Sequence, residues 1–329
     1  MTPPSLDRFA GCLLGQALGD SLGFPVEGRP TEVCALYVER LRKGERRGAR
    51  GFPCGQYTDD TQLARELLQS FVACGGFDPA DYGRRVGAIF SERRIVGRGR
   101  ATEQAARALA AGTPWEQAGT PAPAAGNGTA MRAAPVGLLC WRDPAELLRV
   151  ARDQGLVTHR DPRCSAGSIA IAGAACLAAR EGPLERGPFL AQLAEWVANE
   201  DAGFAEEIRK LEEWLKLAPT DALPLISRAG LDPDYEDRWI GISPFVVGSV
   251  LWSLYSFLRT PDDYLETICT AIACGGDVDT TAAMAGGLSG ARLGLAALPE
   301  EQVRVVDRGT WGQPELLELA ERAWRLVSG

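Results

Sequence analysis

Apolar residues recur at three- and four-residue spacing along most of this chain of 329 residues. Such spacing gathers them on one face of an α-helix. Alternating runs of β-branched residues, which a half-buried strand needs, are nearly absent. The pattern predicts an all-α fold with helical segments at 6–23, 62–74, 80–93, 101–111, 145–154, 165–180, 188–198, 203–217, 244–258, 261–274, 280–297 and 314–327.

Small residues are concentrated in two of these segments, 165–180 and 280–297. Faces made of glycine and alanine let helices approach closely, so we predict that both are buried core helices. Their apolar runs are too short and too interrupted to span a membrane. The short stretch 119–126, rich in proline, glycine and alanine, is interpreted as an active-site loop rather than a linker. No boundary is visible, which predicts one domain over residues 1–329.

The charge balance and the cysteines restrict the class of protein. The net charge is −8 and no basic stripe is present, so nucleic acid is not expected as a partner. The nine cysteines are scattered and never form Cys-x-x-Cys, a pattern typical of reduced thiols in the cytosol. The N-terminal residues lack the features of a signal peptide. We therefore expect a soluble, cytoplasmic monomer that does not associate with membranes.

Two acidic motifs lie far apart in the sequence, and each combines two carboxylates with threonine hydroxyls. These are the hard oxygen ligands that Mg²⁺ or Mn²⁺ accept. Each motif taken alone fits helix capping better, because Thr and Asp are preferred at helix N-termini. Four carboxylates that converge would nevertheless repel each other without a cation. The sequence predicts a shared metal site with the ligands Thr58, Asp59, Asp60, Asp277, Asp279 and Thr280.

Two further segments offer candidate binding groups. Glu27 follows Pro25 in a loop after the first predicted helix, where it is either free to point into a cleft or an idle surface carboxylate. The glycine-rich segment 126–132 offers backbone N–H groups that can hold a diphosphate, although a lone glycine-rich turn is more often only a turn. Both readings stay open for each segment.

His159 is the only histidine of the chain, which excludes a zinc site built from several histidines. It stands between Thr158 and Arg160, just before Asp161-Pro162, which is typical of a helix entry. A lone histidine at such a place is usually a capping or core residue. On its own, this motif does not indicate a function.

Taken together, the motifs resemble those of the ADP-ribosylglycohydrolase family. They extend from about residue 6 to about residue 295, nearly the whole chain. The matching elements are Gly19-Asp20-x-x-Gly23, Thr58-Asp59-Asp60-Thr61, Gly126-Asn127-Gly128-Thr129-x-Met131-Arg132, Thr158-His159-x-Asp161-Pro162 and Gly275-Gly276-Asp277-x-Asp279-Thr280.

The resemblance implies a compact, single-domain orthogonal helical bundle with a two-metal centre, usually of magnesium, that holds the ribose of the scissile bond. The six metal ligands named above would form that centre. Family members commonly have serine where this chain has Thr129, and the hydroxyl is kept. The residues implied to lie along the diphosphate and ribose, or near the ligand, are Gly126, Asn127, Gly128, Thr129, Met131 and His159.

The resemblance also implies an activity, the removal of ADP-ribose from a protein side chain or a small acceptor. The branch similar to serine-ADP-ribose and O-acetyl-ADP-ribose hydrolases has a glutamate seven residues after the Gly-Asp aspartate, and Glu27 stands seven residues after Asp20. Glu27 or Asp60 is then expected to orient or deprotonate the attacking water. The alternatives are an arginine-specific hydrolase, a catalytically silent ADP-ribose-binding or structural protein, and a metal-dependent phosphate-ester hydrolase.

Overall fold

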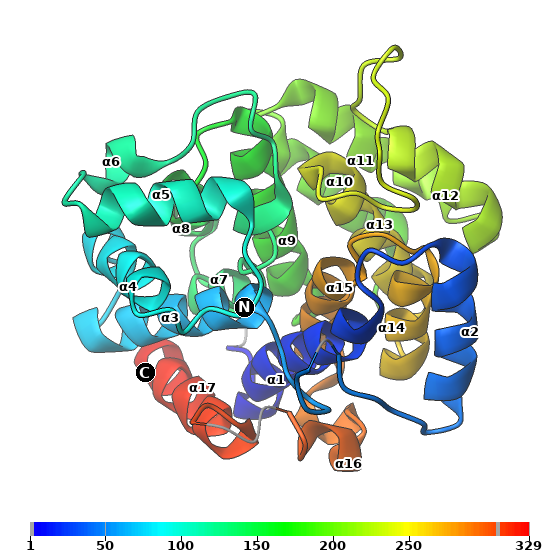
Figure 1. Ribbon diagram of the computed structural model, residues 1–329, viewed down its shortest axis with the longest axis horizontal. Helices are drawn as coiled ribbons and strands as arrows, with labels where there is room; N and C mark the ends of the chain where they lie inside the picture. The colour runs from blue at the N-terminus through cyan, green and yellow to red at the C-terminus, as the bar shows by residue number, and fades with distance from the viewer. Residues whose placement is uncertain (1–2, 50, 307–309, 329) are drawn as a thin grey trace.

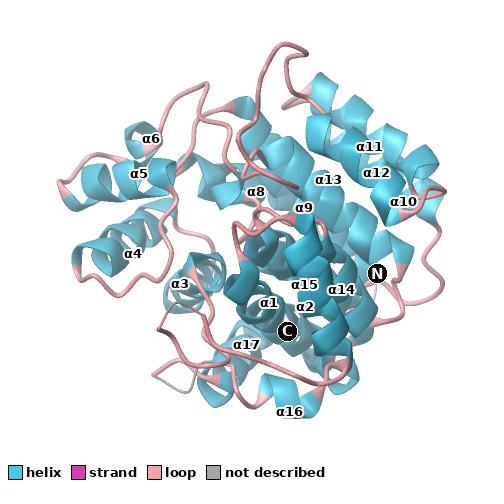
Figure 2. Cartoon of the chain, turned by 45° about the vertical axis from the view of Figure 1, so that its right-hand side comes forward, coloured by secondary structure: helices cyan, strands magenta, loops and turns pink. Residues whose placement is uncertain are grey.

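The computed structural model describes residues 3–49, 51–306 and 310–328, and within these ranges it contains helices and loops but no strand (Figures 1 and 2). The all-α prediction is confirmed. The α-helices are α1 Leu6–Gly23, α2 Thr31–Arg42, α3 Asp59–Cys74, α4 Pro79–Ser91, α5 Arg100–Ala110, α6 Trp115–Ala118, α7 Ala134–Leu139, α8 Pro144–Leu156, α9 Pro162–Ala178, α10 Arg186–Val197, α11 Ala202–Trp214, α12 Pro219–Arg228, α13 Val246–Arg259, α14 Tyr264–Ala273, α15 Val278–Leu293, α16 Glu300–Val303 and α17 Gln313–Ser328.

Every segment predicted as helical contains a helix, but some bounds differ and several helices were not predicted. The predicted segment 280–297 ends earlier, because Gly294 has φ of 84° and stops α15 at Leu293. Helix α2 was missed, although its buried residues Cys34, Tyr37, Val38 and Leu41 follow the helical spacing. None of the helices in the described ranges combines the length and apolarity needed to cross a bilayer.

Helices α1 and α15 cross in the middle of the molecule and pack antiparallel (Figure 1). The contact is close because α1 has a glycine at every fourth position, and a Cβ on any of these would overlap the backbone of α15 or of the turn that follows it. The glycines are Gly11, Gly15, Gly19 and Gly23. The antiparallel packing brings the C-terminal end of α1 beside the start of α15. Residues near 20 and near 280 therefore become neighbours.

Helix α9 is the second buried helix, as its small residues predicted. It contacts α15, α13, α7 and α8, and most of its residues have less than a tenth of their surface exposed. Helices α10 to α12 cover one side of this centre, and α3 to α6 cover another (Figures 1 and 2). The loops that join these groups meet at the ends of α1, α3 and α15, which is where the candidate site lies.

Candidate active site

Isolated bridges between backbone segments fix the region around the start of α15. Gly276 exchanges backbone hydrogen bonds with the segment 28–29, at 2.8 and 2.9 Å. On its other side, the N–H of Asp277 donates to the carbonyl of Ile242 at 2.8 Å. The loop after α1, the start of α15 and the segment before α13 thus form one connected layer. This layer places Glu27 beside Asp277.

The start of α3 is held by a side chain from another helix. The N-cap residue Thr58 makes no capping bond with its own side chain. Instead the buried carboxylate of Asp20, on α1, accepts the backbone N–H groups of Thr58 and Thr61 at 3.0 and 3.1 Å. It also accepts both threonine hydroxyls, at 3.0 and 2.7 Å. Asp20 therefore caps α3 in place of a local residue and fixes the first turn, which carries Asp59 and Asp60.

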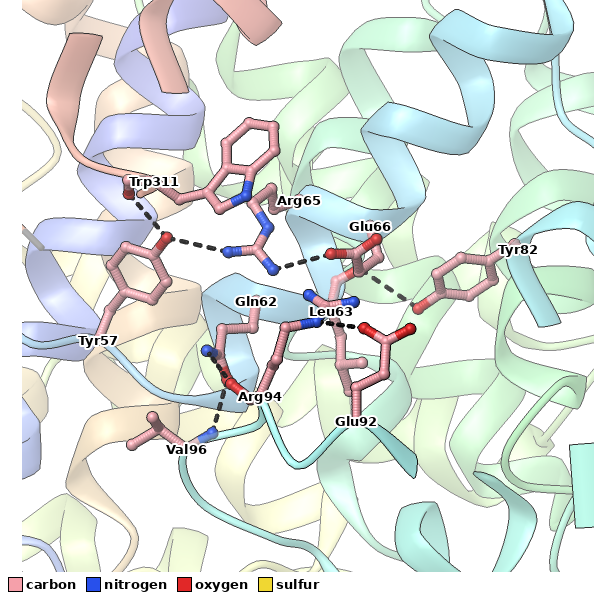
Figure 3. Close-up of polar contacts among 10 residues, drawn as sticks. All are labelled: Tyr57, Gln62, Leu63, Arg65, Glu66, Tyr82, Glu92, Arg94, Val96 and Trp311. Atoms are coloured by element: carbon pink, nitrogen blue, oxygen red, sulfur yellow. Dashed lines mark hydrogen bonds and ion pairs between the residues drawn. The ribbon is translucent and has the colours of Figure 1, made fainter. Parts of the chain in front are cut away.

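The next turns of α3 are anchored as well (Figure 3). The Gln62 amide donates to the carbonyl of Arg94 at 3.1 Å and accepts the N–H of Val96 at 2.8 Å. These bonds hold the loop that leads to α5. Farther along, the buried guanidinium of Arg65 lies over the ring of Trp311 and forms an ion pair with Glu66 at 2.8 Å. The helix that carries the two aspartates is thus fixed along its first two turns.

A cavity of about 890 Å³ opens where these segments meet. Its size is in the range of small-molecule and cofactor sites. One end is acidic, the other is formed largely by glycine-rich backbone and apolar side chains, and Arg98 and Arg100 line the wall that α5 and the loop before it contribute. The lining residues are Glu27, Asp59, Asp60, Gly97, Arg98, Gly99, Arg100, Ala101, Thr102, Gln104, Thr120, Pro121, Pro123, Ala124, Ala125, Gly126, Asn127, Gly128, Met131, His159, Trp239, Pro244, Asp277, Asp279 and Thr280.

At the acidic end, carboxylate oxygens of Glu27, Asp277 and Asp279 lie within 4.8 Å of one another. The Asn127 amide donates to Asp277 Oδ2 at 2.7 Å, so the glycine-rich loop is tied directly to the acidic group. Asp59 and Asp60 enter the same cavity from α3. The two acidic motifs, 218 residues apart from 59 to 277, therefore meet in one cavity.

Burial and mutual repulsion make these carboxylates hard to ionise. Burial, with neighbouring carboxylates, raises the pKa of Asp59 to about 7, and burial above all raises the pKa of Asp277 to about 6. The same causes raise the pKa of Asp60 and Asp279 well above the usual value. Within the described ranges, Asp60 Oδ1 and Asp279 Oδ1 are buried and accept no hydrogen bond.

These observations fit a bound cation. Buried oxygen acceptors without a donor are costly, and an ion that binds them removes the cost. Carboxylate and hydroxyl oxygens are the ligands of Mg²⁺ and Mn²⁺ rather than of softer metals. The chemistry of the donor set therefore agrees with the expected metal site.

The model of one protein family, described as ADP-ribosylglycohydrolase, matches residues 1–329. The chain belongs to the ADP-ribosylglycohydrolase family. It is therefore an enzyme of the hydrolase class that acts on ADP-ribosylated substrates.

Individual members of the ADP-ribosylglycohydrolase family are similar over most of their length. ADP-ribosylhydrolase ARH3 of Gallus gallus is 31% identical and covers 90% of this chain and 88% of its own. ADP-ribosyl-[dinitrogen reductase] glycohydrolase of Rhodospirillum rubrum is 28% identical, with 93% of each chain covered. A solved structure described as an ADP-ribosylglycohydrolase-related protein complex superposes with a TM-score of 0.72 at 29% identity and covers 98% of this chain and 99% of that chain.

Most site residues that the family resemblance implied do line the cavity, but two do not. Thr58 is buried behind the surface, with its hydroxyl between Asp20 and Asp60 at 3.0 Å from each. Thr129 was expected to offer its hydroxyl to the ligand, and instead that hydroxyl donates to the carbonyl of Cys164 at 2.7 Å. The side chain of Thr129 therefore supports the loop from behind.

Sequence reasoning missed a whole side of the cavity. The start of α5 and the loop before it contribute residues 97–102, and a Cβ on Gly97 would lie 2.5 Å from the carboxylate of Asp59. The closely spaced pair Gly97 and Gly99 was the only signal in the sequence. Trp239 was missed too, because it comes from a charged segment without a recognisable pattern.

Proposed function

We propose that this enzyme uses Mg²⁺ to remove ADP-ribose from an acceptor linked through oxygen, such as a serine side chain or an acetyl group. The observation that carries the proposal is the position of Glu27. Its carboxylate belongs to the acidic group with Asp277 and Asp279, so it is close to where the scissile bond of the ligand would lie. The names of the relatives called ARH3 and of the dinitrogen reductase glycohydrolase are consistent with this class of reaction.

The proposal assigns a direction to the ligand. The ribose that carries the acceptor would lie at the acidic end, against Asp59, Asp60, Asp277 and Asp279. The diphosphate would lie along the backbone of 126–128, where N–H groups favour an anion. The adenosine would lie toward Trp239 and the proline-rich loop 121–125, which supply apolar surface. We propose Asp59, Asp60, Asp277, Asp279 and Thr280 as the residues that hold two magnesium ions. Thr58 would join them only if its hydroxyl turned from Asp20 toward the ion beside Asp60.

The chemistry follows from the roles of these residues. The magnesium ions that these residues would hold would supply ligand positions for ribose hydroxyls and would lower the pKa of a water. Breaking a bond at the anomeric carbon passes through an oxocarbenium-like state, which a nearby carboxylate stabilises. Glu27 would accept the proton of the attacking water and return it to the departing oxygen. Asp60, whose Oδ1 is free of hydrogen bonds in the described ranges, is the alternative base.

An experiment on linkage tests the proposal. Purified enzyme would be assayed with a serine-linked peptide, an arginine-linked peptide and O-acetyl-ADP-ribose, each with Mg²⁺ and with EDTA. We expect release of ADP-ribose from the oxygen-linked substrates only, and only with Mg²⁺. Glu27→Gln should lower kcat by about 10²–10⁴-fold, as loss of a general base does.

Glu32→Gln, on the exposed side of α2, is the matched control and should keep the wild-type rate. Faster release from the arginine-linked peptide would show that the enzyme is an arginine-specific hydrolase instead. ADP-ribose binding without release from any of the three substrates would identify a silent binding protein instead.

A further inference from the structure

A buried arginine lies directly behind the glycine-rich loop. Arg132 is fully buried, and its guanidinium stands over the ring of Tyr82. Within the described ranges it forms no ion pair. All its hydrogen bonds go to neutral acceptors: the carbonyl of Gly128, the side chain and carbonyl of Gln154 at 2.7 and 2.8 Å, and the hydroxyl of Thr158 at 2.8 Å.

The hydrogen bond from Arg132 determines the direction in which the Thr158 hydroxyl donates. A guanidinium can only donate, so Thr158 Oγ1 accepts from it. Within the described residues, the hydroxyl can then donate to one of two acceptors, the carbonyl of Gly155 at 3.4 Å or Nδ1 of His159 at 2.9 Å. The Gly155 carbonyl already accepts two backbone N–H groups at 2.9 Å, which occupies both lone pairs. The proton therefore points to His159 Nδ1.

The other side of the His159 ring faces the cavity. The residue is only 2% exposed, yet it lines the cavity, and Nε2 has no hydrogen-bond partner in the described part of the chain. A Cβ on Gly126 would lie 3.4 Å from Nε2, and one on Gly128 would lie 2.9 Å from Cε1. The two glycines thus leave the Nε2 edge open. Burial, aided by the charge of Arg132, lowers the pKa of His159 to about 3, so the ring is neutral.

We propose that Arg132 and Thr158 are positioning residues that fix His159 as the tautomer protonated at Nε2, whose N–H donates into the cavity to a phosphate oxygen of the ligand. A neutral imidazole carries one N–H, and an accepting Nδ1 forces that N–H onto Nε2. The identity of the ligand rests on the proposed function, whereas the tautomer rests on the hydrogen bonds alone. Arg132 also adds a buried positive charge behind the loop that would hold the diphosphate.

The tautomer can be observed directly, because the chain has a single histidine and all imidazole nitrogen signals belong to it. In protein labelled with ¹⁵N we expect a pyrrole-type signal at Nε2 and a pyridine-type signal at Nδ1, unchanged between pH 5 and pH 8. A ring protonated at Nδ1, or one that becomes charged in this interval, would overturn the proposal. This measurement uses the wild-type protein and does not depend on how any variant folds.

Variants of Thr158 test the positioning role. Thr158→Val keeps the shape and removes the hydroxyl, so the two ring nitrogens should show exchange between tautomers. The Kd of ADP-ribose with Mg²⁺ should rise about tenfold, as expected for the loss of one hydrogen bond to a charged group. Thr158→Ser restores the hydroxyl and should restore both the spectrum and the affinity. Thr267 is a different buried threonine, on α14, and Thr267→Val removes its hydroxyl. This control should change neither the spectrum nor the affinity.

The two proposals fail in different ways. If the wild-type protein shows the expected tautomer but does not bind ADP-ribose, the ligand is wrong and so is the proposed function. If it binds ADP-ribose and Thr158→Val binds equally well with an unchanged spectrum, the positioning role is wrong and the proposed function stands.

Discussion

The cavity has two ends that both bury charge, and the charges have opposite signs. At one end, Asp59, Asp60, Asp277 and Asp279 are nearly excluded from solvent. At the other end, the fully buried Arg132 supports the glycine-rich loop and forms no ion pair within the described ranges. Isolated buried charge is costly, and proteins usually pair it within the fold. Here the buried charge at each end would be compensated by a bound ligand rather than by another side chain.

The difference between the ends indicates what each end accepts. Carboxylate oxygens dominate the acidic end, and within the described residues Asp60 Oδ1 and Asp279 Oδ1 have no hydrogen-bond donor, so this end favours cations. The loop end offers N–H groups and a neutral histidine, and therefore selects an anion. A nucleotide sugar bound together with magnesium meets both requirements at once. Substitutions can therefore weaken one end of the cavity without changing the other.

Removing charge from the acidic end should abolish the reaction. Asp59→Asn and Asp277→Asn each remove a proposed metal ligand while keeping the shape of the side chain. We expect kcat/KM to fall by at least about 10³-fold, because several kcal/mol of charge stabilisation are lost. Turnover would be measured with saturating Mg²⁺, and circular dichroism would check that the helices remain.

Asp262→Asn is the control for both substitutions, since this aspartate is largely exposed in the turn between α13 and α14. It should keep full activity. Full activity in both Asp59→Asn and Asp277→Asn would show that the acidic end is not the metal site.

Weakening the support of the acidic end should have a smaller effect. The Asp20 carboxylate is surrounded by hydrogen-bond donors, the N–H and hydroxyl groups of Thr58 and Thr61. In Asp20→Asn the amide NH₂ would face one of these donors and could not accept a hydrogen bond from it. The first turn of α3 would then shift, and we expect Mg²⁺ affinity to fall about 10- to 100-fold, as for other groups that orient metal ligands. Titration of Mg²⁺ by calorimetry measures this change.

Thr61→Val is a milder change that leaves the Asp20 carboxylate in place, so it tests the orientation of the first turn of α3 with less risk to folding. It removes one of the hydroxyl donors to Asp20 and should have an intermediate effect on Mg²⁺ affinity. An affinity in Asp20→Asn equal to that of the wild type would show that the cap on α3 has no role in binding.

The smallest expected effect concerns the stability of the metal-free protein. An acid whose pKa is higher in the folded state keeps its proton longer there, so its contribution to stability is lost as the pH rises through the folded value. With Asp59 at about 7 and Asp277 at about 6, this loss covers the interval from about pH 4 to pH 7. In EDTA we expect Tm to fall by roughly 5 °C between pH 5 and pH 8.

Magnesium should reverse most of this fall at pH 8, because it compensates the ionised carboxylates. Asp277→Asn should show a smaller fall than the wild-type protein in EDTA. A Tm that stays constant across this interval, or rises, would mean that the carboxylates are neutralised by the protein itself.

The fold was largely readable from the sequence because most helices bury one stripe of residues, and that stripe sets the helical spacing. Helix α12 escaped detection because Pro224 lies inside it, and proline within a pattern usually indicates a helix end. The metal-site candidates were found because aspartate and threonine in pairs carry their chemistry in their residue type.

Other parts of the site depend on contacts between segments far apart in the sequence. Nothing near Thr58 indicates that its helix is capped by Asp20, 38 residues earlier. Likewise, the relay from Arg132 through Thr158 to His159 exists only once α8 and the glycine-rich loop are packed together. Such roles depend on the three-dimensional contacts between these segments, and residue spacing in the sequence does not predict those contacts.

The central claim is that one cavity binds a cation at its acidic end and the diphosphate of ADP-ribose at its loop end. Calorimetric titration of ADP-ribose into the purified protein, once with Mg²⁺ and once with EDTA, tests it most directly. The account predicts binding that requires Mg²⁺. Absence of binding in both buffers, or equal binding in both, would contradict it.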